Sequence, residues 1–152
     1  MKKFEFTGET KTISLFFRTA TLHRIRAVAE FGLVKIGDLG GWIEKEENLS
    51  HEGKAWVCGD AEVWGNAKVF SASHVLVIGA IGSRDDFTTF FRDKDNEITV
   101  KCGCFIGKID KFLEKVTQTH GDSKYALVYR AAVEVARLQI DLSGEAPKDA
   151  DE

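Results

Sequence analysis

The chain has 152 residues, enough for one domain with a buried core but too few for two comfortable ones. Its 21 Lys and Arg residues nearly balance 24 Asp and Glu residues, so no strong overall charge would recruit a nucleic-acid polymer or anionic lipid. The first residues lack the unbroken apolar stretch of a signal peptide, and no window approaches a membrane span. We therefore expect a cytoplasmic protein with reduced cysteines and no membrane association.

Residues 1–42 are predicted to form N-terminal strands, because β-forming side chains recur there. Residues 22–28 alternate in polarity, which places Arg24 and Arg26 on one strand face and His23 on the other. Arg18 lies nearby in sequence, so several donors could converge on a phosphate. The alternative, given equal weight, is a solvated strand face paired with acids such as Glu30.

A six-residue repeat dominates the middle of the chain. It places small residues at Ala55, Ala61 and Ala67 and branched residues at Val57, Val63 and Val69. This period, with Gly-Asp and Gly-Asn turns between the hexads, is typical of a triangular coil, so we predict a short left-handed parallel β-helix over residues 43–80. The regular hexads complete only about one coil, and a solenoid usually needs about three stacked units, so the coil requires a cap or other subunits.

The rest of the chain is predicted to be a hairpin and a helical pair. Strands flank a polar turn at 93–96 within residues 86–106, with the second strand continuing beyond Gly103. Apolar residues at helical spacing predict helices over about 108–119 and 123–142. The inner stripe of the second helix comprises Ala126, Tyr129, Val133, Ala136 and Ile140. We thus expect a mainly β fold with α, one compact domain over 1–142, and a disordered acidic tail over 143–152.

Two groups of motifs resemble known proteins. Arg24–Ala27 and Leu39–Glu44, followed by the hexads, resemble a family of phage and prophage proteins in which an Arg-Ile-Arg-Ala segment leads into hexapeptide coils. Cys104–Gly107 and Thr119–Gly121 resemble a two-helix module common in phage genes. The resemblance implies a phage protein acting in the cytoplasm of a bacterial host. Members are described as uncharacterised or, from the coils alone, as transferases, so it implies no particular reaction.

Four residues are candidates for catalysis or metal binding: His51, His74, Cys102 and Cys104. Hexapeptide acyltransferases use a histidine as general base between long stacked coils, and His51 and His74 are the candidates. One coil is too short for such a groove, so no catalytic residue is predicted. Cys102 and Cys104 lack the second pair of a zinc site, and strand alternation would bury both thiols on one side. We predict no metal and no cofactor.

Large aromatic residues accompany the repeat. Trp56, Trp64 and Phe70 adjoin the inward valines, so alternation turns them outward. They either pack against other parts of the protein or form a stacking surface for a flat ligand. The ligand-binding candidates are therefore Arg18, His23, Arg24, Arg26, Trp42, Trp56 and Trp64.

Three functions are compatible with these features. The preferred hypothesis is a non-enzymatic, phage-encoded homo-oligomer, trimeric or larger, that binds a small nucleotide-like ligand and sequesters a host immune signal. The second is an acyl- or sugar-transferase-like enzyme, which rests on the hexads alone. The third is a module for protein–protein assembly. The scarcity of catalytic signatures makes an enzyme the less favoured class.

Overall fold

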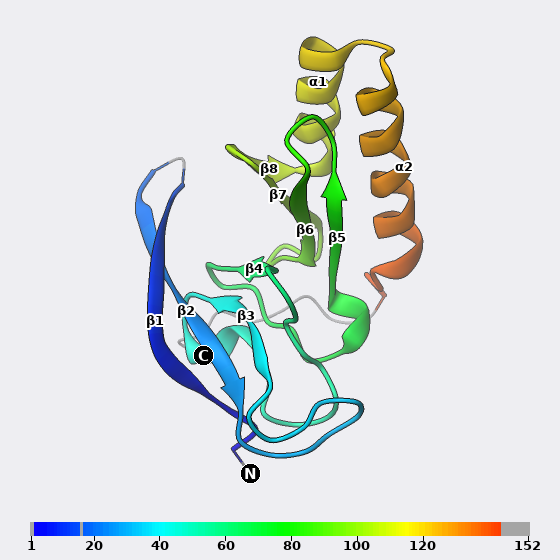
Figure 1. The fold of residues 1–152 in the computed structure, drawn as a ribbon. Helices are drawn as coiled ribbons and strands as arrows, with labels where there is room; N and C mark the ends of the chain where they lie inside the picture. Colours follow the sequence, from blue (N-terminus) through cyan, green and yellow to red (C-terminus); the bar gives the residue numbers. More distant parts are fainter. Residues whose placement is uncertain (1, 16, 144–152) are drawn as a thin grey trace.

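The computed structural model describes residues 2–15 and 17–143, so the predicted tail lies, apart from its first residue, outside the described residues (Figure 1). The strands are β1 (Phe4–Ser14), β2 (Thr19–Ala27), β3 (Leu39–Ile43), β4 (Glu62–Val63), β5 (Val75–Ile81), β6 (Asp86–Arg92), β7 (Ile98–Cys102) and β8 (Phe105–Lys108). The helices are α1 (Ile109–His120) and α2 (Lys124–Gln139), with 3-10 turns at Glu46–Asn48 and Ala72–His74.

The first sheet has the strand order β1-β2-β3-β4, with antiparallel pairing between β1, β2 and β3 and parallel pairing of β3 with β4. Strands are present in the N-terminal segment, as predicted. The simple alternation predicted for β2 is wrong, because Leu22 and Ile25 are both fully buried. The pairing with β1 shifts register between His23 and Ile25, and such an irregularity changes which side chains face the core.

The prediction of a left-handed parallel β-helix over 43–80 is wrong. Most of this segment is turns and irregular chain; β4 contributes only two residues, and the last part is β5, which belongs to a second sheet. Among the described residues, parallel pairing consists of the β3–β4 pair and a single bridge between Leu49 and Val69. The side-chain pattern is nevertheless as expected, since Val57, Val63 and Val69 are fully buried. The hexads therefore mark which residues face the core without making a repeating ladder.

Asn48 ties the hexad segment to the chain after β3. Its side-chain oxygen accepts hydrogen bonds from the backbone N–H of Glu44 at 3.1 Å and of Lys45 at 2.9 Å. Its amide nitrogen donates to the carbonyls of Gly65 at 2.9 Å and Ala67 at 2.8 Å. Asn48 is fully buried, and this one side chain is a hydrogen-bond partner of four backbone groups.

The second sheet is antiparallel, with the order β5-β6-β7-β8. The predicted hairpin is confirmed as β6 and β7. Its turn is held by Asp93, which accepts hydrogen bonds from the N–H groups of Asp95 and Glu97. The predicted continuation of the second strand past Gly103 is wrong, because the chain reverses at Gly103, where φ is +57°, and returns as β8.

The two helices lie close to their predicted positions, along the second sheet (Figure 1). Ser123 caps α2 by accepting a hydrogen bond from the N–H of Ala126. The predicted inner stripe of α2 is confirmed, because all five of its residues are buried. These side chains share a core with Phe90, Val100 and Phe112.

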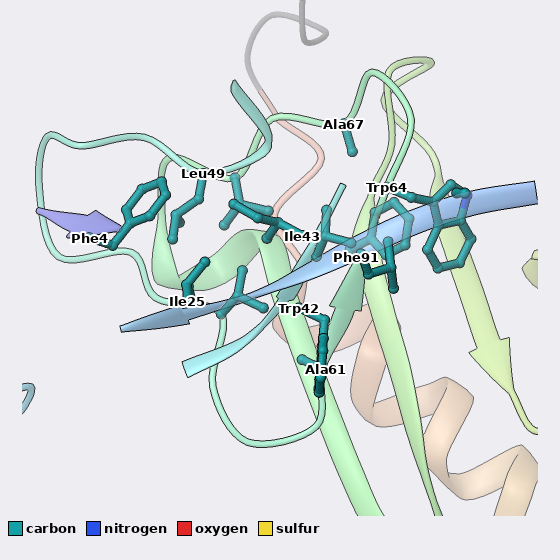
Figure 2. Close-up of a cluster of buried hydrophobic side chains, with 14 of the residues drawn as sticks. Phe4, Ile25, Trp42, Ile43, Leu49, Ala61, Trp64, Ala67 and Phe91 are labelled. Carbon is teal, nitrogen blue, oxygen red and sulfur yellow. The ribbon is translucent and has the colours of Figure 1, made fainter. Parts of the chain in front are cut away.

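A second core lies beneath the first sheet and reaches across to the other half of the molecule. Phe91 of β6 belongs to it and makes an edge contact with Trp64, with ring centroids 4.8 Å apart (Figure 2). Polar contacts join the halves as well: Glu62 of β4 pairs with Lys101 of β7 at 3.5 Å, and the Glu62 N–H donates to Thr89. The two sheets are thus linked through β4 and β6.

Candidate functional site

Two of the predicted ligand-binding residues, Arg24 and Trp42, meet on the first sheet. The Arg24 guanidinium lies 5.4 Å from the Trp42 ring centroid, and its Nε donates to the Gly40 carbonyl at 3.1 Å. The Lys11 ammonium is also over the Trp42 ring, at 4.5 Å. Trp42 is only 7% exposed, so the chain's own cations cover the ring that a flat ligand would need.

The other predicted cationic residues are paired within the chain. Arg18 forms two hydrogen bonds with the Glu44 carboxylate, and this contact lowers the pKa of Glu44 and raises that of Arg18. Arg26 pairs with Glu5 at 2.7 Å. His23 stacks on Phe6, with ring centroids 4.3 Å apart. The structure therefore does not bring these residues together around a shared opening, and Glu30 is not their partner.

The two remaining candidates, Trp56 and Trp64, lie against the protein itself. Trp56 is half-buried and meets Phe31 edge-on at 5.3 Å, whereas Trp64 is buried against Phe91. Phe70, the third aromatic residue of the hexads, remains 52% exposed. Trp64 is therefore too buried for a ligand to stack on it, and Trp56 is partly covered.

The two histidines that were candidates for a general base, His51 and His74, make different hydrogen bonds through their ring nitrogens. His51 Nδ1 accepts the Lys3 N–H at 2.9 Å, so its Nε2 carries the proton and faces Glu46 at 2.8 Å. His74 is buried and its Nδ1 accepts the Phe70 N–H at 3.3 Å. Burial lowers the pKa of His74. His51 has no free lone pair to take a proton from a substrate, which argues against the acyltransferase mechanism at that residue.

A pocket of about 190 Å³ lies elsewhere, between the end of the second sheet and the helices. It combines the β5–β6 turn, the β7–β8 turn, α1 and the start of α2. The residues that line it are Ser83, Arg84, Asp86, Cys102, Gly103, Cys104, Phe105, Phe112, Lys115, Val116, Thr119, His120 and Tyr129. The buried or half-buried aromatic residues form its walls, and the exposed polar residues form its rim.

The rim carries two cations without an acidic partner. Neither Arg84 nor Lys115 forms an ion pair with any described residue, although Asp86 also lines the pocket. Arg84 points a nitrogen to within 3.7 Å of the Cys104 sulfur, which holds it beside the opening. The hydroxyls of Ser83 and Thr119 are further donors on the rim. The rim can therefore accept an anionic group.

The wall of the pocket is aromatic. The rings of Phe112 and Tyr129 meet edge-on at 5.7 Å, Phe105 lies 5.4 Å from Phe112, and His120 lies 5.7 Å from Tyr129. Burial, and next the Cys102 thiol, raise the pKa of the Tyr129 phenol, so its O–H stays protonated and can donate.

Gly82 makes room for this phenol. Its φ is +80°, a backbone conformation that favours glycine, and a Cβ at this position would collide with the Tyr129 hydroxyl. The glycine thus fixes where the tyrosine oxygen ends within the pocket wall.

The two cysteines differ from the prediction that strand alternation would bury both. They flank the turn at Gly103, where Cys102 is half-buried and accepts a hydrogen bond from the Thr88 hydroxyl at 3.3 Å, while Cys104 is exposed. Among the described residues, no group of three or more His, Cys, Asp or Glu side chains is arranged to hold a metal ion.

The prediction missed Arg84 and Lys115, which lie in no recognisable motif. The sequence nonetheless drew attention to two segments, Cys102–Cys104 and Thr119–Gly121, and both contribute residues to the lining of the pocket.

The chain matches no known protein-family profile, and no curated protein matches it significantly. Within the described part of the chain, the helices are too short or too polar to cross a membrane.

Proposed function

We propose that this protein is a non-enzymatic binding protein that holds a nucleotide-like ligand in the pocket between the second sheet and the helices. The observation that carries the proposal is the pair Arg84 and Lys115, two cations without acidic partners in the described chain, at the rim of an aromatic-walled pocket. A phosphate would take the rim cations, and a base would contact the aromatic wall.

The dimensions of the pocket limit how much of the ligand it encloses. At about 190 Å³ it is smaller than the roughly 300–1,000 Å³ of pockets that bury a drug-sized molecule. One ring system would enter between Phe105, Phe112 and Tyr129, while charged groups would remain near the rim. A ligand of this kind fits a nucleotide-derived signal of a bacterial host cytoplasm, which a phage protein would sequester.

Titration calorimetry would test the proposal with ADP-ribose and cyclic di-AMP as probes and adenosine as the uncharged control. We expect the phosphorylated probes to bind and adenosine to bind much more weakly. Arg84→Gln or Lys115→Gln removes a charged hydrogen-bond donor, which contributes about 1.5–3 kcal/mol, so affinity should fall about ten- to one-hundred-fold.

Lys111→Gln is the matched control, because Lys111 also lies on exposed α1 surface but pairs with Glu114 and does not line the pocket. Its affinity should equal that of the unmodified protein. Lack of binding by every probe at millimolar concentration, or equal losses for Lys111→Gln and Lys115→Gln, would contradict the proposal. Recovery of a chemically altered probe would instead favour an enzyme.

A further inference from the structure

Lys3 is a buried lysine without an acidic partner. Its side chain is 3% exposed, and it forms no ion pair with any residue that the structure describes. Lysine is almost never fully buried unless it is paired, because a charged ammonium loses its hydration there. Burial accordingly lowers the pKa of Lys3, so a larger fraction of its amine carries a free lone pair than in an exposed lysine.

The Lys3 amine is held in one position. Its Nζ donates to the Ala55 carbonyl at 2.6 Å and lies 4.7 Å from the centroid of the Phe31 ring. The backbone of Lys3 is fixed as well, since its N–H donates to His51 Nδ1 at 2.9 Å and its carbonyl accepts the Val28 N–H at 2.9 Å. One N–H is enough for the bond to Ala55, so the other positions on the nitrogen remain available for reaction.

A second small pocket, of about 150 Å³, is lined by Lys3 and the apolar ring of Phe31. The small residues Ala29 and Gly53 also line it, and a Cβ on Gly53 would meet no atom within 4 Å, so this side is open. The exposed residues Lys2 and Glu30 complete the lining with one charge of each sign, which favours an uncharged ligand. At roughly 30 Å³ for each water molecule, the pocket accommodates about five non-hydrogen atoms.

His51 lines the same pocket but does not compete as the reactive group. Its Nδ1 accepts the Lys3 N–H, and its Nε2 faces Glu46 at 2.8 Å, so both ring nitrogens are engaged. The imidazole ring stacks on Phe4 with centroids 4.1 Å apart, which fixes this side of the pocket. Among the described residues that line the pocket, Lys3 is therefore the buried group with a nucleophilic nitrogen.

We propose that Lys3 is a covalent binding site for a short, uncharged aldehyde, which it holds as a reversible imine. The amine nitrogen attacks the carbonyl carbon, and a proton moves from nitrogen to oxygen to give a carbinolamine. The carbinolamine takes up one proton and loses water, which leaves a protonated carbon–nitrogen double bond. This nitrogen keeps one N–H to donate to Ala55, and the aldehyde chain lies along Phe31. The inference is independent of the nucleotide-like ligand proposed for the other pocket.

Reductive trapping on the full chain tests this site. Propanal and sodium cyanoborohydride at pH 7 convert each imine into a stable secondary amine, and peptide mass spectrometry measures the rate at each lysine. Lys54 is the matched reference, because it is exposed, directly precedes Ala55 and does not line the pocket. Only about one exposed lysine in 2,500 is unprotonated at pH 7, so Lys3 should react at least tenfold faster than Lys54.

The pocket itself is tested by blocking it and by enlarging the reagent. Ala29→Phe places a ring in the pocket and should slow the reaction of Lys3 at least tenfold while leaving that of Lys54 unchanged. Pyridoxal 5′-phosphate is too large for the pocket and should show no preference for Lys3. Thermal unfolding verifies that the variant is folded. Equal rates of propanal addition at Lys3 and Lys54, a full rate at Lys3 in the folded Ala29→Phe variant, or a preference of pyridoxal 5′-phosphate for Lys3 would overturn the proposal.

Discussion

Asn48→Ala gives the sharpest test of how the irregular hexad segment is held. The substitution removes all four hydrogen bonds of the buried amide and leaves the N–H groups of Glu44 and Lys45 and the carbonyls of Gly65 and Ala67 without that partner. Each bond contributes about 0.5–1.5 kcal/mol net, so the loss should be about 4 kcal/mol in the free energy of unfolding. That is a large part of the roughly 5–15 kcal/mol typical of a domain.

Urea unfolding followed by tryptophan fluorescence would measure this loss, because Trp42 and Trp64 are buried and report exposure of the core beneath the first sheet. For a chain of this size, the corresponding drop in melting temperature is roughly 8–16 °C. The exposed Gln139→Ala is a control and should change stability by less than about 0.5 kcal/mol.

Asn48→Asp separates the two halves of the network. A carboxylate still accepts the N–H groups of Glu44 and Lys45, but it cannot donate to the carbonyls of Gly65 and Ala67 and repels them. It should therefore destabilise the protein by at least about 2 kcal/mol. The reasoning fails if Asn48→Ala loses less than about 1 kcal/mol, or if Asn48→Asp is as stable as the unmodified protein.

Three further predictions follow from burial. Because burial holds the pKa of His74 below its ordinary 6.5, the unfolded chain takes up this proton first, so the free energy of unfolding should decrease as pH falls below about 6.5. His74→Gln should lessen that slope, and an unchanged slope would refute the assignment. Gly82→Ala forces Tyr129 aside at a positive φ and should cost more than about 1 kcal/mol and weaken probe binding in calorimetry. Val63→Ala removes two fully buried methyl groups and should cost about 2 kcal/mol in urea unfolding, whereas half-exposed Val135→Ala should cost less than about 0.5 kcal/mol; equal losses would contradict this.

Elements defined by local periodicity could be predicted from the sequence. The β6–β7 hairpin and both helices follow from alternation, turn residues and the stripe that includes Tyr129 and Val133, all of which lie within short windows of the chain. The burial of Val57, Val63 and Val69 was predictable for the same reason.

The arrangement of the hexads could not be predicted in this way. A six-residue side-chain period reports which residues are buried, but the backbone partners come from residues 41–50, where the period is lost. With Lys45 and His51 in place of inward valines, that segment turns, and Asn48 binds its neighbours instead of a strand ladder forming. The prediction of a β-helix failed at this step.

The candidate site shows a related difference between local and tertiary information. Residue type suggested Arg24 and Trp42 as ligand-binding residues, but in the structure Arg24 and Lys11 both lie over the Trp42 ring. Arg84 lies on a turn and Lys115 on a helix, and only the folding of the second sheet against α1 brings both to one pocket. No spacing in the sequence could indicate that convergence.

The neighbouring residues Phe90 and Phe91 on β6 constrain how this protein can change during evolution. Each enters a different core, since adjacent side chains of a strand point to opposite faces. Deleting or inserting one residue in β6 would reverse every later side chain and exchange the contents of the two cores. Changes in chain length should therefore be tolerated at the exposed turn near Asp95 but not within β6. A destabilising substitution on either face of β6 will affect both halves of the molecule.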